Sequence, residues 1–147
     1  MKDTNNLYDY ERWSAGEYDN FNITTQYGKS VITNKYSTIG ESSLFYQQSN
    51  PANFGYVYID SNIQITSGDN YSISFDAYCP DANFVTVIRQ TGELVRVIIP
   101  QNNKLQHVNM SFTANASHNV RLQLFNDISS SRIFIDNLSL IKLSWQK

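Results

Sequence analysis

The feature that most constrains this chain is a two-residue alternation of apolar and polar side chains, which recurs along most of its length. The clearest instance is residues 71–79, where every second side chain is apolar. Successive side chains of a β-strand point to opposite faces, so this period predicts a strand with one face on a core. The inward set is Tyr71, Ile73, Phe75, Ala77 and Cys79, and the outward set is Ser72, Ser74, Asp76 and Tyr78.

Similar segments follow one another along the chain and are separated by turn signals. They predict further strands at residues 44–46, 56–59, 84–90, 94–99, 108–112 and 120–124. A hairpin is expected at Thr91-Gly92-Glu93, and long polar connections are expected between residues 17 and 36. Helical periodicity is nearly absent. About nine or ten antiparallel strands without a repeat unit predict an all-β fold, a two-sheet antiparallel sandwich or jelly roll formed by residues 1–147 as a single domain.

The last predicted strand carries one carboxylate, Asp136, among apolar residues. Ile133, Ile135, Leu138 and Leu140 would all point inward if the strand slips by one residue at Asp136-Asn137, which is the sequence pattern of a β-bulge. A carboxylate in this position needs a partner. Solvent or backbone N–H groups could serve, and so could a metal ion or a buried ion pair.

Composition excludes several classes of function. The net charge is −2 and only 16% of the 147 residues are charged, so the clustered Lys and Arg of nucleic-acid or anionic-membrane binding are not expected. No segment approaches the roughly 20 apolar residues of a membrane span, and the polar start lacks the apolar core of a secretory signal. We therefore expect a soluble module, one that could belong to a longer secreted protein.

A single cysteine, Cys79, excludes an internal disulfide and a cysteine-cluster zinc site. Alternation places it inward, as a buried thiol. Catalytic motifs are also missing: the two histidines, His107 and His118, lack metal-ligand spacing, and no nucleophile elbow or phosphate loop occurs. An enzyme is therefore not expected. A small lyase or hydrolase on a jelly roll remains an alternative.

Five sequence pieces occur in a recognisable order. They are Asn6-Leu-Tyr-Asp-Tyr-Glu11, Ile39-Gly-Glu-Ser-Ser-Leu-Phe45, Gly68-Asp-Asn-Tyr-Ser-Ile-Ser-Phe75, Ser111-Phe-Thr-Ala114 and Ile135-Asp-Asn-Leu-Ser-Leu140. Together they resemble the strand motifs of the carbohydrate-binding jelly rolls found on bacterial cellulases and xylanases. The resemblance covers nearly the whole chain. It departs at the opening strand, where Tyr10 stands in place of the usual phenylalanine.

The resemblance implies a structural calcium ion where the first and last strands meet. Calcium takes about six to eight oxygen ligands, which can come from residues far apart in sequence. The ligands implied are Asp136 and Glu11, with oxygens near Gly40 and Glu41. The alternative is that Glu11 and Asp136 are unconnected surface carboxylates.

The resemblance also implies a sugar site on the concave sheet, built from outward residues of the strands at 71–79 and 120–126. Aromatic rings stack on sugar rings, and planar polar groups bond to pairs of hydroxyls. The implied residues are Asp76, Tyr78, Arg89, Arg96, Arg121, Gln123 and Phe125, with Trp13 or Tyr18 on the rim and Ser74 and Asn109 as neighbours. Alternatively, a loop covers the aromatics and Arg121 serves only solubility.

Together, the resemblance and the missing catalytic motifs lead to one expected function and one alternative. We expect non-catalytic binding of a polysaccharide or cell-surface glycan by a module covalently linked to other domains of an extracellular, cell-surface or virion-surface protein. The alternative is a structural or adhesive domain of a phage tail or surface protein that no longer binds sugar.

Overall fold

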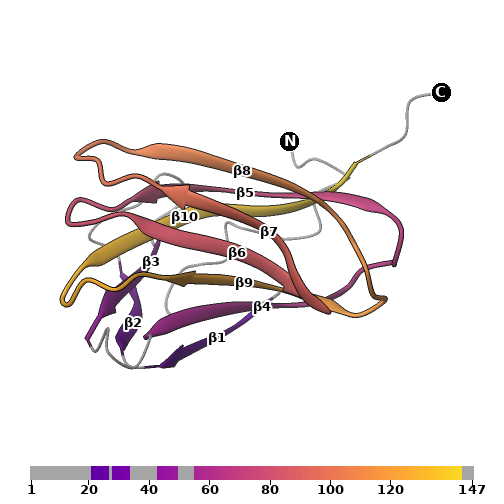
Figure 1. The fold of residues 1–147 in the computed structure, drawn as a ribbon, viewed down its shortest axis with the longest axis horizontal. Coiled ribbons are helices and arrows are strands. Elements are labelled where there is room, and N and C mark those ends of the chain that lie inside the picture. Colours follow the sequence, from indigo (N-terminus) through magenta and orange to yellow (C-terminus); the bar gives the residue numbers. More distant parts are fainter. Residues whose placement is uncertain (1–20, 27, 34–42, 50–54, 144–147) are drawn as a thin grey trace.

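The computed structural model describes residues 21–26, 28–33, 43–49 and 55–143, and these form two antiparallel sheets of five strands each (Figure 1). The strands are β1 (Phe21–Gln26), β2 (Gly28–Thr33), β3 (Ser43–Gln48), β4 (Tyr56–Gln64), β5 (Asn70–Tyr78), β6 (Phe84–Gln90), β7 (Gly92–Ile99), β8 (Gln106–Thr113), β9 (Asn119–Phe125) and β10 (Arg132–Lys142). The predicted all-β sandwich is confirmed. Within these residues no helix has the length and apolar character needed to cross a bilayer.

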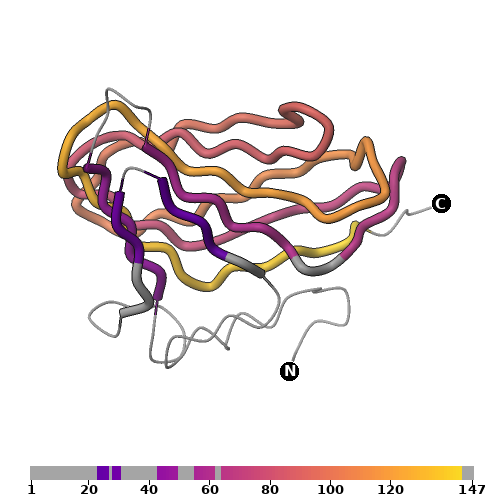
Figure 2. The backbone as a smooth tube through the Cα atoms, turned by 90° about the horizontal axis from the view of Figure 1, so that it is seen from below, coloured from indigo at the N-terminus to yellow at the C-terminus, as the bar shows by residue number. Residues whose placement is uncertain are grey.

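Strand order differs from chain order in both sheets. Sheet I has the order β1-β4-β9-β6-β7, and sheet II has the order β2-β3-β10-β5-β8. Figure 1 shows sheet I running from β1 at the bottom to β7, and Figure 2 turns the molecule to show β2 and β3 at one end of it. The chain forms a hairpin at β6–β7 and crosses between the sheets at each connection from β4 to β6 and from β7 to β10.

The core lies between the two sheets and consists of the inward residues that alternation predicts. β8 shows the pattern most clearly, since its side chains alternate between exposed and buried along the strand. Cys79 is fully buried, as predicted. The largest buried side chains come from both sheets and include Tyr46, Phe75, Phe84, Ile59, Ile73, Ile88 and Met110.

The predicted bulge in the last strand is present. Asp136 pairs with Asp76 and Ser139 pairs with Ser74, so β10 contains one residue more than β5 over this stretch. Asn137 lies at the bulge and has a positive φ of 55°. The slip turns both Ile135 and Leu138 inward, and each is 1% exposed.

The expectation of long polar connections between residues 17 and 36 was wrong for residues 21–26 and 28–33, which form β1 and β2. Among the described strands both lie at the edge of their sheet, and each pairs with one described neighbour. An edge strand is less covered than a central one, so it tolerates polar side chains, and this weakens the pattern by which a strand is recognised.

Candidate functional site

The outer surface of sheet I gathers aromatic and charged side chains in three rows, and we call it the sheet I face. Val57 and Ile59 of β4 and Leu122 and Leu124 of β9 are buried in the core, so the residues between them point outward. Strand register sets the rows: the first is Tyr56, Phe125, Val85 and Ile98, the second is Tyr58, Gln123, Val87 and Arg96, and the third is Asp60, Arg121 and Arg89.

Three half-buried rings form the aromatic part of this face. Tyr56 and Tyr58 lie two residues apart on β4, with ring centroids 4.2 Å apart and an interplanar angle of 31°. The Cζ atom of Arg121 lies 3.9 Å from the centre of the Tyr58 ring, and that of Arg96 lies 5.7 Å from the centre of Phe125. Such cation–π contacts attract the guanidinium groups to the faces of the rings.

Hydrogen bonds fix the polar groups between the rings. Arg121 donates two bonds to Asp60, Nε to Oδ1 at 2.6 Å and Nη2 to Oδ2 at 3.0 Å, and this pairing raises the pKa of Arg121. Arg89 Nε donates to Gln123 Oε1 at 2.8 Å. Glu93 accepts hydrogen bonds from Arg96, which lowers the pKa of its carboxyl group. The planar groups on this face are therefore held in defined orientations.

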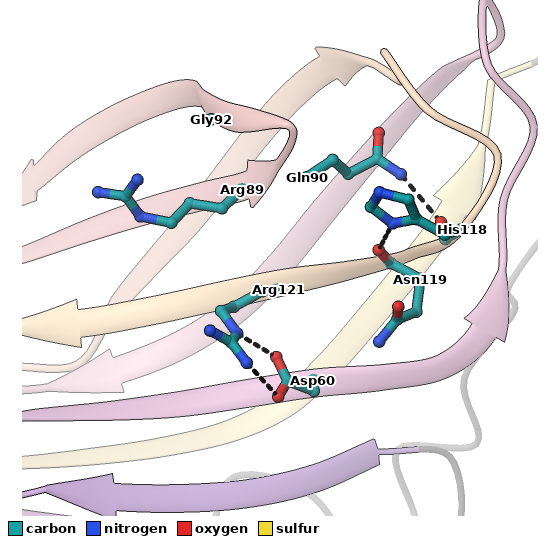
Figure 3. Close-up of a pocket in the computed structure, with 7 residues that line it drawn as sticks. All are labelled: Asp60, Arg89, Gln90, Gly92, His118, Asn119 and Arg121. Atoms are coloured by element: carbon teal, nitrogen blue, oxygen red, sulfur yellow. Dashed lines mark hydrogen bonds and ion pairs between the residues drawn. The ribbon is translucent and has the colours of Figure 1, made fainter.

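A cavity of about 270 Å³ lies beside the third row and is lined by Asp60, Arg89, Gln90, Gly92, His118, Asn119 and Arg121 (Figure 3). Two hydrogen bonds connect the chain segments beside this cavity. Gln90 Nε2 donates to the backbone oxygen of His118 at 2.9 Å, and Asn115 Nδ2 donates to that of Thr91 at 2.9 Å. Gly92 has a φ of 79°, which the tight β6–β7 turn requires.

The structure brings together five of the residues predicted to bind sugar and separates two others from them. Arg89, Arg96, Arg121, Gln123 and Phe125 all lie on the sheet I face. The prediction that the strand at 71–79 shares this face was wrong, because Asp76 and Tyr78 belong to β5 in sheet II. Alternation shows whether a side chain points in or out, but not which sheet its strand joins.

The side chains that β4 adds to the face, Tyr56, Tyr58 and Asp60, were not among the residues predicted to bind sugar. The signal was available, because residues 56–59 were recognised as a strand and inward Val57 and Ile59 imply outward tyrosines. Their place beside Gln123 and Arg121 could not be read from the sequence. Trp13 and Tyr18, predicted for the rim, lie outside the described residues.

The outer surface of sheet II carries a different set of polar side chains. Asp76 accepts a hydrogen bond from Asn137 Nδ2 at 3.2 Å, and its Oδ1 lies 2.8 Å from His107 Nδ1. Ser74 and Asn109, predicted as neighbours of the sugar site, also lie here and bond to Ser139 and Ser72 respectively. Beside these polar groups, Tyr78, Phe134 and Phe45 form an aromatic row on the same surface, with the Phe134 ring centroid 6.0 Å from that of Tyr78 and 4.9 Å from that of Phe45.

Asp136, the predicted calcium ligand, is 1% exposed and faces Asp76 across the bulge of β10. Two neighbouring carboxylates, one of them buried, suit a hard cation. The other predicted ligands, Glu11, Gly40 and Glu41, lie outside the described residues. The residues that the structure does describe contain no group of three or more His, Cys, Asp or Glu side chains that could hold a metal ion. Calcium therefore stays a prediction.

No protein-family model and no curated protein sequence matches this chain. Solved structures do match its fold. The carbohydrate-binding module TmCBM61 in complex with β-1,4-galactotriose is 13% identical, with a TM-score of 0.65 over 94% of this chain and 99% of that one. The xylan-binding CBM22-1 domain of Paenibacillus barcinonensis Xyn10C is 10% identical, with a TM-score of 0.64 over 84% of this chain and 87% of that one.

A third match is the enzymatically active domain of tailspike protein 4 from bacteriophage CBA120, at 13% identity and a TM-score of 0.65. It covers 91% of this chain, which spans only 20% of the tailspike chain. Identities this low show a shared fold and leave the ligand open. The chain therefore has the sandwich fold of carbohydrate-binding modules, as the sequence motifs predicted.

Proposed function

We propose that this chain is a non-catalytic module that binds a polysaccharide or cell-surface glycan through the sheet I face, within a larger extracellular or phage protein. The observation that carries the proposal is the set of rings at Tyr56, Tyr58 and Phe125 beside the hydrogen-bonded planar groups of Gln123 and Arg89. The resemblance to carbohydrate-binding modules in both sequence motifs and fold supports it.

The chemistry of this face suits an extended sugar chain. Rings give the apolar surface that packs on the C–H faces of pyranoses, while amide and guanidinium groups bond to adjacent hydroxyls. Residues two apart on a strand are about 7 Å apart, so the three rows extend over about 14 Å along the strands. Several successive sugar residues could therefore contact the protein at once.

The carboxylates on this face do not suit glycoside hydrolysis. A glycosidase requires one carboxyl group that holds a proton as a general acid and a second one across the scissile bond. Both oxygens of Asp60 accept hydrogen bonds from Arg121. Glu93 is bonded to Arg96, and its pKa is lowered, which favours the ionised form. Binding without catalysis is the function that this arrangement favours.

Affinity electrophoresis against a panel of plant and microbial polysaccharides tests the proposal. At least one polysaccharide should retard the wild-type protein. Tyr58→Ala and Phe125→Ala should each weaken that retardation about tenfold or more, since truncating a ring at the centre of an interface costs about 2 kcal/mol. Tyr78→Ala, an equal truncation on sheet II, is the matched control and should leave binding unchanged. Retardation that depends on Tyr78 and not on Tyr58 would refute the assignment.

A structural or adhesive domain of a phage tail is the second candidate, and the tailspike match favours it. This reading predicts that no polysaccharide retards the wild-type protein, and that the gene lies beside genes for tail or capsid proteins.

A further inference from the structure

The charged side chains that the structure describes on the sheet I face are Arg89, Arg96, Arg121, Asp60 and Glu93. Two matched pairs account for four of them. Arg121 and Asp60 form a two-pronged pair, and Arg96 donates three hydrogen bonds of 2.8 to 3.3 Å to Glu93. Arg89 has no such partner: its nearest carboxylate oxygen among the described residues is Glu93 Oε1, 4.0 Å from Nη2, and Arg96 already binds that oxygen.

The guanidinium of Arg89 is also held in a fixed orientation. Its Nε donates to Gln123 Oε1 at 2.8 Å, while Nη1 and Nη2 donate no hydrogen bond within the described part of the chain. The side chain is 34% exposed and lines the cavity beside the third row. Figure 3 shows Arg121 turned toward Asp60, with Arg89 lying apart from that pair. Two parallel N–H groups on one fixed guanidinium match the geometry of a carboxylate.

We propose that this cavity binds an acidic sugar residue, a hexuronic acid, whose carboxylate pairs with Arg89 while the neighbouring sugars of the chain lie over the aromatic rows. The inference rests on the proposed glycan binding and names the substrate class. The cavity, at about 270 Å³, lies just below the roughly 300–1,000 Å³ of drug-sized ligand sites, which suits a single sugar ring. The net charge of −2 would otherwise disfavour an anionic polymer, so recognition needs a local, unmatched cation.

The test compares acidic polysaccharides with their carboxyl-reduced forms, which keep the sugar ring and linkage but lose the charge. Polygalacturonate, alginate, glucuronoxylan and hyaluronan supply the pairs, and titration calorimetry or affinity electrophoresis measures binding. For at least one pair, the wild-type protein should bind the acidic form about tenfold or more tightly than the reduced form, as for a hydrogen bond between charged groups. This preference should fall as salt is raised.

Three variants locate the preference. Arg89→Gln should remove it, so that the acidic and the reduced form bind with equal affinity, whatever the variant's affinity for the reduced form. Gln123→Glu is isosteric and leaves Arg89 in place, but it supplies a carboxylate to that guanidinium and should also remove the preference. Lys104→Gln is the control, because it removes an equal charge from an exposed loop between β7 and β8.

The possible results distinguish failure of the acidic-sugar inference from failure of the proposed glycan binding. Equal binding of acidic and reduced forms, still lost in Tyr58→Ala, overturns the acidic-sugar inference and leaves the proposed function intact. Binding of no polysaccharide at all overturns both. A preference that Lys104→Gln lowers as much as Arg89→Gln reflects general charge and removes the cavity from the explanation.

Discussion

One buried side chain, Gln48, joins the two sheets at the end of the sandwich where the first row of the sheet I face lies. It closes β3 in sheet II and is fully buried. Its Nε2 donates to the backbone oxygens of Gly55 and Asn126, both at 2.8 Å. Gly55 directly precedes Tyr56 and Asn126 directly follows Phe125 in sheet I. We predict that Gln48→Met, which keeps the length and the apolar volume, lowers stability by removing both bonds.

The magnitude follows from the two carbonyl groups that the substitution leaves without a donor. Each belongs to a buried residue, and an unsatisfied buried acceptor costs about 1–3 kcal/mol, so the pair costs about 2–6 kcal/mol. Small domains have about 5–15 kcal/mol in all, so the loss is a large fraction of it. At about 2–4 °C per kcal/mol for a chain of this size, the melting temperature should fall by about 4–24 °C.

Urea unfolding followed by circular dichroism measures the change, with the free energy extrapolated linearly to water. Gln47→Met is the matched control. The Gln47 amide bonds to Ser130 O at an exposed position, where water can replace it, so the cost should stay within about 0.5 kcal/mol. If Gln48→Met is no less stable than Gln47→Met, the role of Gln48 in joining the sheets is wrong.

Four further predictions concern single sites. The hydroxyl of Thr86 is fully buried and has no hydrogen-bond partner in the described part of the chain, so Thr86→Val should stabilise the protein by about 1–2 kcal/mol in the same urea assay, and a loss of stability would contradict this. Burial raises the pKa of Cys79 to about 11, so a thiol reagent at pH 8 should label it only after unfolding, and rapid labelling of the native protein would contradict burial. The hydrogen bond from Arg132 lowers the pKa of Asp81, so this pair stabilises the fold above the ordinary pKa of an aspartate, and the contribution is lost as pH falls through the lower folded-state value. Both side chains are partly exposed, so Asp81→Asn should flatten the acid limb of the stability curve by less than about 1 kcal/mol, and an unchanged limb would count against the pair. For calcium at Asp136, a chelator should lower the melting temperature of the wild-type protein but not that of Asp136→Asn, and the absence of any shift in the wild type would argue against the ion.

Local patterns predicted much of the fold. Residues 84–90 were predicted as a strand and form β6 over the same bounds. The one-residue slip at Asp136-Asn137 was also predicted, because only a slip turns apolar residues on both sides of it inward. β1 and β2 were missed, since edge strands need fewer apolar residues. The role of Gln48 was invisible, because a buried glutamine has no sequence signature until its acceptors are known.

The sequence by itself determined that the chain folds into antiparallel strands and which side of each strand faces the core. Alternation is a property of neighbouring residues, so it can be recognised without knowledge of the rest of the fold. Only the tertiary structure decided which outward residues share a surface. Pairing between distant strands places β4, β9 and β6 together, and so brings Tyr58, Gln123 and Arg89 onto one face while Tyr78 lies on the other sheet. The physical reason is that strand order depends on packing of the whole chain, which no local period records.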